Sequence, residues 1–151
     1  MKVKTIPDTI TPFGGINFLI DAFRKFGINK LVNKQLGKRA PNASYSYADV
    51  FAAWWSIIFC GVDCAENIQE HLKDTLCAHP GMKVPSADVL LSAPKELTTT
   101  VITHISKKGI THEFNHNEKM SDLLLQLLKH LRLLEEGSSY VLYYDNQVIP
   151  T

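Results

Sequence analysis

Two short stretches of this sequence carry residue types that could do chemistry, and the first is residues 140–146. Here an apolar and aromatic run ends in an Asp-Asn pair. Aromatic and β-branched residues fit a pleated, packed surface, so residues 140–144 predict a buried strand. Asp145 would then stand at the end of that strand, where its carboxylate is held in place and solvent can reach it. Such a position suits chemistry, although Asp145 and Asn146 could instead simply begin a turn.

The second stretch, His112-Glu113-Phe114-Asn115-His116, matches the pattern H-E-x-x-H. In zinc proteases with this pattern, two histidines one helical turn apart bind zinc and the glutamate acts as general base. The chemistry requires the five residues to lie inside a helix. Here a Lys-Lys-Gly sequence precedes them and Asn115 is a predicted helix N-cap, so they would lie at a helix start. With Glu135 or Glu136 as third ligand, a zinc hydrolase is a remote alternative.

A further metal site can be assembled on paper from three cysteines and two histidines: Cys60, Cys64, Cys77, His71 and His79. Zinc modules usually contain paired Cys-x-x-Cys spacings, which this sequence lacks. Free cysteines commonly behave as small buried apolar groups, and we interpret these three in that way. Their odd number also suits reduced thiols in a reducing compartment.

One interval of the chain is markedly basic. No acidic residue occurs between Asp21 and Asp49, and six basic residues lie there: Arg24, Lys25, Lys30, Lys34, Lys38 and Arg39. They could form an ordinary solvated surface. They could also contact the phosphates of a nucleic acid, where each contact releases counterions and adds salt-dependent affinity.

The overall composition limits the function classes. The chain has 151 residues, of which 45% are hydrophobic and 21% charged, enough for one domain with its own core. The net charge is +1, so any nucleic-acid surface must be local. No apolar run reaches the roughly 18 residues of a membrane span. The first residues lack the apolar core of a signal peptide, so we expect a cytoplasmic protein.

The hydrophobic pattern predicts a helical domain that positions these groups. Apolar residues recur at helical spacing over 16–23, 28–36 and 120–134, with Gly27 and Gly137 as helix ends. Ser46 and Asp49 form a capping-box pair before residues 50–60, which are apolar almost all round. A helix apolar on every face must be surrounded by protein, so we expect this one at the centre.

Three more helices are expected from local signals, which also mark the start of the helix over 120–134. Asp63 with Glu66, and Asn115 with Glu118, resemble capping boxes, and residues 85–88 start a short helix that Pro94 ends. Residues 96–105 are also predicted helical, despite a β-branched run of poor helix propensity. The strand after Gly137 would need a neighbour, either the extended N-terminal residues or another molecule.

Several of these stretches, taken in order, resemble the N-terminal part of a bacterial insertion-sequence transposase of the DDE type, in the group 1 DDE transposase domain family. They cover nearly the whole chain: Ile10-Thr11-Pro12-Phe13-Gly14-Gly15, Tyr45-Ser46-Tyr47-Ala48-Asp49, Cys60-Gly61-Val62-Asp63-Cys64-Ala65-Glu66, Pro85-Ser86-Ala87-Asp88, the helix at 115–128, and Tyr144-Asp145-Asn146-Gln147-Val148-Ile149.

The resemblance implies a fold and a chemistry. In such enzymes a ribonuclease-H-like domain brings together two aspartates and a glutamate, which hold two Mg²⁺ ions that activate water or a DNA 3′-hydroxyl. By resemblance Asp145 is the first aspartate, both catalytic and metal-binding. The implied fold is mainly α: a helical domain over 1–137 that binds transposon-end DNA or a second subunit, and the first strand of an incomplete catalytic domain over 138–151.

The chain departs from the family pattern in ways that shape these expectations. It contains one of the three acidic metal ligands, so we expect this polypeptide to be inactive alone. Tyr143 and Tyr144 stand where the family often has another acidic residue, and Gln147 stands where it usually has Thr. Residues 91–97 lack the arginines expected in that helix. An alternative from another function class is a helical domain that mediates self-association, for example as a homodimer, and has no role in DNA binding.

Overall fold

The computed structural model describes residues 11–141, and residues 1–10 and 142–151 lie outside the described part. The described chain is mainly α-helical with one small antiparallel sheet, which confirms the predicted mainly-α class. In chain order the elements are α1 (Ile16–Lys25), α2 (Ile28–Leu36), α3 (Tyr47–Phe59), the π-helix η1 (Ile68–Leu72), α4 (Lys73–Cys77), α5 (Ala87–Ser92), the 3₁₀-helix η2 (Lys95–Leu97), β1 (Thr100–Ile105), β2 (Thr111–His116) and α6 (Glu118–His130).

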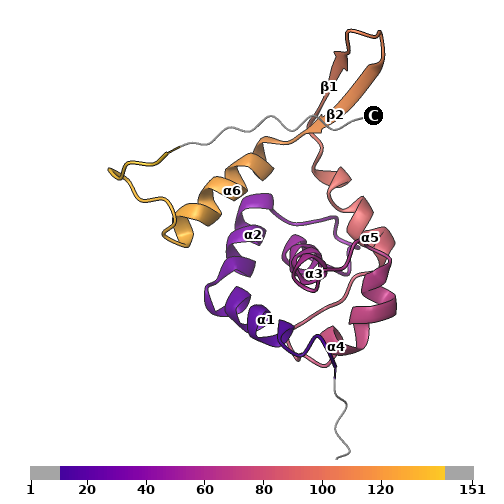
Figure 1. Cartoon of the computed structure of the whole chain (residues 1–151), viewed down its shortest axis with the longest axis vertical. Helices are drawn as coiled ribbons and strands as arrows, with labels where there is room; N and C mark the ends of the chain where they lie inside the picture. The colour runs from indigo at the N-terminus through magenta and orange to yellow at the C-terminus, as the bar shows by residue number, and fades with distance from the viewer. Residues whose placement is uncertain (1–10, 142–151) are drawn as a thin grey trace, which may run out of the picture.

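The helix α3 stands at the centre, and the other helices surround it (Figure 1). It begins as predicted, because the Ser46 side chain accepts from the Asp49 N–H and the Asp49 carboxylate accepts from the Ser46 N–H. Its burial is not uniform. Ile57 is 2% exposed, whereas the next residue, Ile58, is 65% exposed. The prediction that protein covers every face of this helix therefore fails in its last turn.

Two clusters of buried side chains pack on opposite sides of α3. One joins α3 to α1, η1, α4 and α5, and the Trp54 indole N–H donates to the Leu90 carbonyl at 3.1 Å across it. The other joins the start of α3 to α2, η2 and α6. Phe23 and Trp55 meet edge to face with ring centroids 5.1 Å apart. Together these contacts hold α3 between two layers of helix.

The hairpin of β1 and β2 projects away from the helices (Figure 1). Its strands pair antiparallel, with Thr100 opposite His116 and His104 opposite His112. Residues 96–105 were predicted to be helical, and that prediction is wrong. The β-branched run from Thr98 to Thr103 prefers extended backbone, and the pairing with β2 satisfies its hydrogen bonds.

Two predicted helix starts are also wrong. The helix expected from Asp63 begins only at Ile68, because Ala65 packs into the core and the segment before it follows the core surface in turns. The helix expected from Asn115 begins at Glu118, and its N-cap is Asn117, whose side chain accepts from the Met120 N–H at 3.1 Å. Asn115 cannot cap because it belongs to β2.

The last helix ends earlier than Gly137, where the sequence predicted its end. After His130, Arg132 takes the left-handed conformation with φ 57°. Its N–H donates to the Lys129 carbonyl, and the Leu133 N–H donates to the Leu128 carbonyl, which is the Schellman pattern of helix termination. Tyr140 and Val141 are not in a strand. The rest of the predicted strand, and Asp145 with it, lies outside the described residues.

Neighbouring isoleucines of α3 test the central role of this helix. Ile57→Ala should destabilise the domain by about 2–5 kcal/mol, because it removes a buried side chain and leaves a cavity. Ile58→Ala removes the same atoms from an exposed position and should cost about 0.5 kcal/mol or less. Urea unfolding followed by circular dichroism measures both. If both variants lost the same free energy of unfolding, the packing described above would be contradicted.

Candidate nucleic-acid interface

A basic groove of about 770 Å³ lies on the surface beside the start of α3. It is lined by Lys34 at the end of α2, by Lys38 and Arg39 in the following loop, and by Lys83 before α5. The structure thus brings together three of the six predicted basic residues. Lys83 comes from 44 or more residues further along the chain than the other three, and the sequence analysis missed it because no local pattern links it to them.

Arg39 forms the wall of this groove and is held by several partners. Its Nε donates to Glu96 Oε2 at 2.9 Å, and its Nη2 donates to the other oxygen of the same carboxylate. Nη1 donates to the Tyr45 carbonyl at 3.2 Å, and the guanidinium lies 5.9 Å from the centre of the Tyr47 ring. The side chain is only 9% exposed. Arg39 is therefore positioned to shape the groove, while Lys34, Lys38 and Lys83 supply its exposed charges, which are unpaired within residues 11–141.

The ion pair between Arg39 and Glu96 shifts the pKa of both side chains. The hydrogen bonds from Arg39 hold the pKa of the Glu96 carboxyl below its ordinary value, and the Glu96 carboxylate raises the pKa of Arg39. Burial, followed by the nearby Glu96 charge, raises the pKa of the Tyr47 hydroxyl. All three groups therefore keep their usual charge states near neutral pH.

One carboxylate, Asp49, also lines the groove. Its Oδ2 accepts hydrogen bonds from both the N–H and the hydroxyl of Ser46, each at 2.8 Å. Asp49 is thus committed to capping α3, and its charge lies beside the free N–H groups of the helix start. Within the described residues, Lys34, Lys38 and Lys83 form no ion pair. The groove is accordingly positive and open to an anion.

The remaining predicted DNA-contacting residues lie outside the groove's lining. Lys25 and Lys30 are exposed at the end of α1 and on α2. The Arg24 guanidinium lies directly over Gly81, where an added Cβ would fall 1.6 Å from Nη1. Three of the six residues thus line the groove, and the other three lie on α1 and α2.

The H-E-x-x-H pattern does not form a zinc-protease site, because His112 to His116 form a strand. Residues four apart in a strand are separated by about 13 Å, too far to share one metal ion. Among residues 11–141, no three His, Cys, Asp or Glu side chains are grouped to hold a metal. His79 is engaged elsewhere: its Nε2 lies 3.0 Å from Asp21 Oδ1, and its Nδ1 accepts from the Gly81 N–H.

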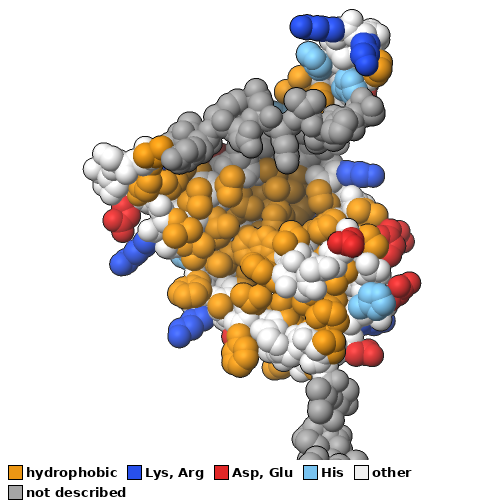
Figure 2. Space-filling model, in the orientation of Figure 1, with side chains coloured by type: hydrophobic (Ala, Val, Ile, Leu, Met, Phe, Trp, Pro, Cys, Tyr) orange, Lys and Arg blue, Asp and Glu red, His pale blue; other side chains and the backbone are white. Residues whose placement is uncertain are grey.

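The structure also has an apolar face, which bears on self-association. Figure 2 shows hydrophobic side chains gathered on the face toward the viewer. An apolar cavity of about 220 Å³ opens among α1, α3 and Leu131, and Phe26 and Phe59 at its edge are more than half exposed. Exposed apolar surface of this kind often marks an interaction site. No described helix is long and apolar enough to span a bilayer.

Comparisons with protein-family models, with curated proteins and with solved structures found no match to this chain.

The Arg39–Glu96 pair makes the stability depend on pH. Because the pKa of Glu96 is lowered in the folded protein, its contribution is present above about pH 4.5 and is lost as the pH falls through the folded-state value. Glu96→Gln should therefore cost about 0.5–1 kcal/mol at pH 7, a modest value because Glu96 is 39% exposed. As the pH is lowered through the folded-state pKa of Glu96, the urea midpoints of the variant and the wild type should converge. A difference that stays constant as the pH is lowered would contradict this assignment.

Proposed function

We propose that this chain is the DNA-binding N-terminal module of an insertion-sequence transposase of the DDE type, as its ordered motifs suggest. The observation that carries the proposal is the basic groove. Lys34, Lys38 and Lys83 come from separate segments and line one concave surface whose single carboxylate is engaged in a helix cap. Ammonium groups that form no ion pair in the described residues suit the phosphate backbone of transposon-end DNA.

Within this proposal Asp145 belongs to the catalytic half of the enzyme. It would be one of three carboxylates that hold two Mg²⁺ ions in a ribonuclease-H-like domain. Asp145 lies outside the described residues, so the proposal for this chain rests on DNA binding.

Loss of the groove's lysines should weaken binding in a salt-dependent way. For Lys38→Ala combined with Lys83→Ala, we expect about tenfold weaker binding of a fluorescent duplex of about 20 base pairs at low salt. The slope of log K against log salt should fall by about two, roughly one per lost phosphate contact. Fluorescence anisotropy at several salt concentrations measures both quantities.

Lys119→Ala combined with Lys129→Ala is the matched control, because it removes the same charge from α6, away from the groove lining. The control should keep the wild-type slope apart from a small general effect of net charge. If both double variants weakened binding equally, the groove would not be the binding surface. If the wild-type protein bound no duplex even at low salt, the proposed function would fail.

The second candidate function is self-association through the apolar face. The exposed aromatic side chains around the cavity near Phe26 and Phe59 favour it. Sedimentation of the protein with and without duplex separates the two functions. Concentration-dependent dimers that ignore DNA favour this candidate, whereas a monomer that sediments with DNA favours the module proposed above.

A further inference from the structure

The β1–β2 hairpin has side chains that the fold does not use. Every strand residue is exposed except His112, which is half-buried. Ile102, Ile105 and Phe114 are each about half exposed or more. A two-stranded hairpin is marginally stable in water on its own. An arm that projects in this way and buries almost nothing therefore presents its side chains to a partner.

The register divides the arm into two unlike faces. Alternate residues of paired strands share a face, so His104, His112, Phe114 and His116 lie on one side together with Ile102. The rings of His112 and Phe114 stack with centroids 6.4 Å apart. Glu113, the one carboxylate of the two strands, occupies the other face. The first face, here called the imidazole face, carries ring N–H groups and aromatic surface without acidic side chains.

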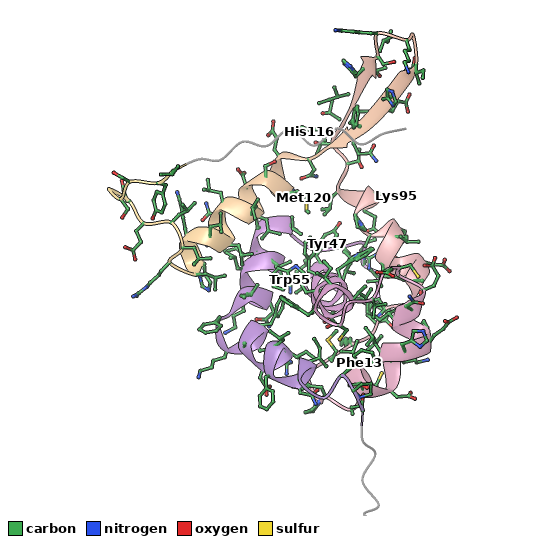
Figure 3. The ribbon with its side chains drawn as sticks, viewed as in Figure 1. Phe13, Tyr47, Trp55, Lys95, His116 and Met120 are labelled. Carbon is green, nitrogen blue, oxygen red and sulfur yellow. The ribbon has the colours of Figure 1, made fainter. Side chains whose placement is uncertain are left out.

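The imidazole face continues into a polar notch at the base of the arm. The notch has a volume of about 390 Å³ and lies where η2, β2 and α6 meet, with Lys95 and His116 in its lining beside Thr98 and Ser121. Figure 3 shows Lys95, His116 and Met120 around this junction. The lining contains no carboxylate. Glu96, next to Lys95, is turned to Arg39 of the basic groove. One ammonium group, hydroxyls and imidazole suit a phosphate.

The far end of the arm is also cationic. Lys107 and Lys108 form the turn between the strands, and both are exposed. From Lys95 through the imidazole face to these two lysines, the surface carries cations and hydrogen-bond donors. A six-residue strand spans about 20 Å, and a two-stranded ribbon is narrow enough to enter the major groove of B-DNA.

We propose that this arm is a second DNA-contacting element, with its imidazole face in a groove of the duplex and a backbone phosphate in the Lys95–His116 notch. The inference rests on the proposed function and adds to it, because the groove beside α3 holds the backbone while the arm reaches base edges. Phe114 and Ile102 supply apolar contacts, and the imidazoles supply hydrogen bonds. Charge decides for DNA over a second copy, because Lys95 at the base of the arm and Lys107 and Lys108 at its tip would face the lysines of the other copy.

The test uses the full chain and two pairs of matched variants. On the arm, His104→Ala with His112→Ala removes the imidazole face, and Thr103→Ala with Thr111→Ala is its control on the opposite face. At the tip, Lys107→Ala with Lys108→Ala is compared with the Lys119→Ala and Lys129→Ala control on α6. All these side chains are exposed except the half-buried His112, so the helical core should remain folded in each variant. Thermal unfolding checks this.

We expect the imidazole-face variant to bind duplex at least threefold more weakly with little change in salt slope, because the lost contacts are to base edges and not to phosphates. The tip variant should bind about tenfold more weakly with a slope reduced by about two. Both controls should bind like the wild type. Amide hydrogen exchange of residues 100–116 should also slow when duplex is added.

Three outcomes would overturn the inference, and they can be told apart. If the arm variants bind DNA like the wild type while Lys38→Ala with Lys83→Ala binds weakly, the arm does not contact DNA and the proposed function stands. If the wild-type protein binds no duplex, both the arm's DNA contact and the proposed function are wrong. Arm variants that abolish dimers in sedimentation and leave DNA affinity unchanged would assign the arm to a second copy of the chain.

Discussion

The burial of α3 is the constraint on which the rest of the structure depends. Most of this helix is apolar, so two layers of helix cover it except at Ile58 and Phe59 in its last turn, and each layer contributes a separate cluster of buried side chains. The free backbone N–H groups at the start of α3 also have acceptors. The Ala48 N–H donates to the Asn33 side chain at 3.1 Å, and the Asp49 N–H donates to the Ser46 hydroxyl. These bonds tie α3 to α2 and fix the segment between them.

The basic groove is a consequence of that arrangement. The chain from Gly37 to Tyr45 must connect two helices whose relative position is already set, and Arg39 anchors it by bonding to Tyr45 and Glu96. Glu96 lies in η2, immediately before the hairpin. One ion pair therefore joins the groove beside α3 to the base of the β1–β2 arm, so the two proposed DNA contacts share a rigid support.

The basic and apolar surfaces use different parts of the same helices. On α2, the side chains of Ile28, Val32 and Leu36 face inward, while Lys30 and Lys34 point away from that stripe. The apolar cavity near Phe26 and Phe59 lies among α1, α3 and Leu131, and none of its lining residues lines the basic groove. Binding of DNA and contact with another protein surface can therefore occur at separate places on one domain.

The sequence by itself determined the helices whose signals are local. The apolar spacing of α1 and α2, the Ser46–Asp49 capping box and the apolar character of α3 depend on residues within a turn or two of one another, so periodicity and capping were enough to predict them. The predictions failed where distant contacts decide. Residues 100–105 become a strand because β2 pairs with them, and Asn117 caps α6 because Asn115 is taken by that pairing.

The same division holds for the candidate site. The sequence showed a basic interval, because a run without acidic residues is visible in one dimension. Only the tertiary structure decided that Arg39 is committed to Glu96, 57 residues away, and that Lys83 joins Lys34 and Lys38. It also placed the histidines of H-E-x-x-H along a strand face instead of a helical turn. Such groupings depend on how buried helices pack, and no local pattern encodes that packing.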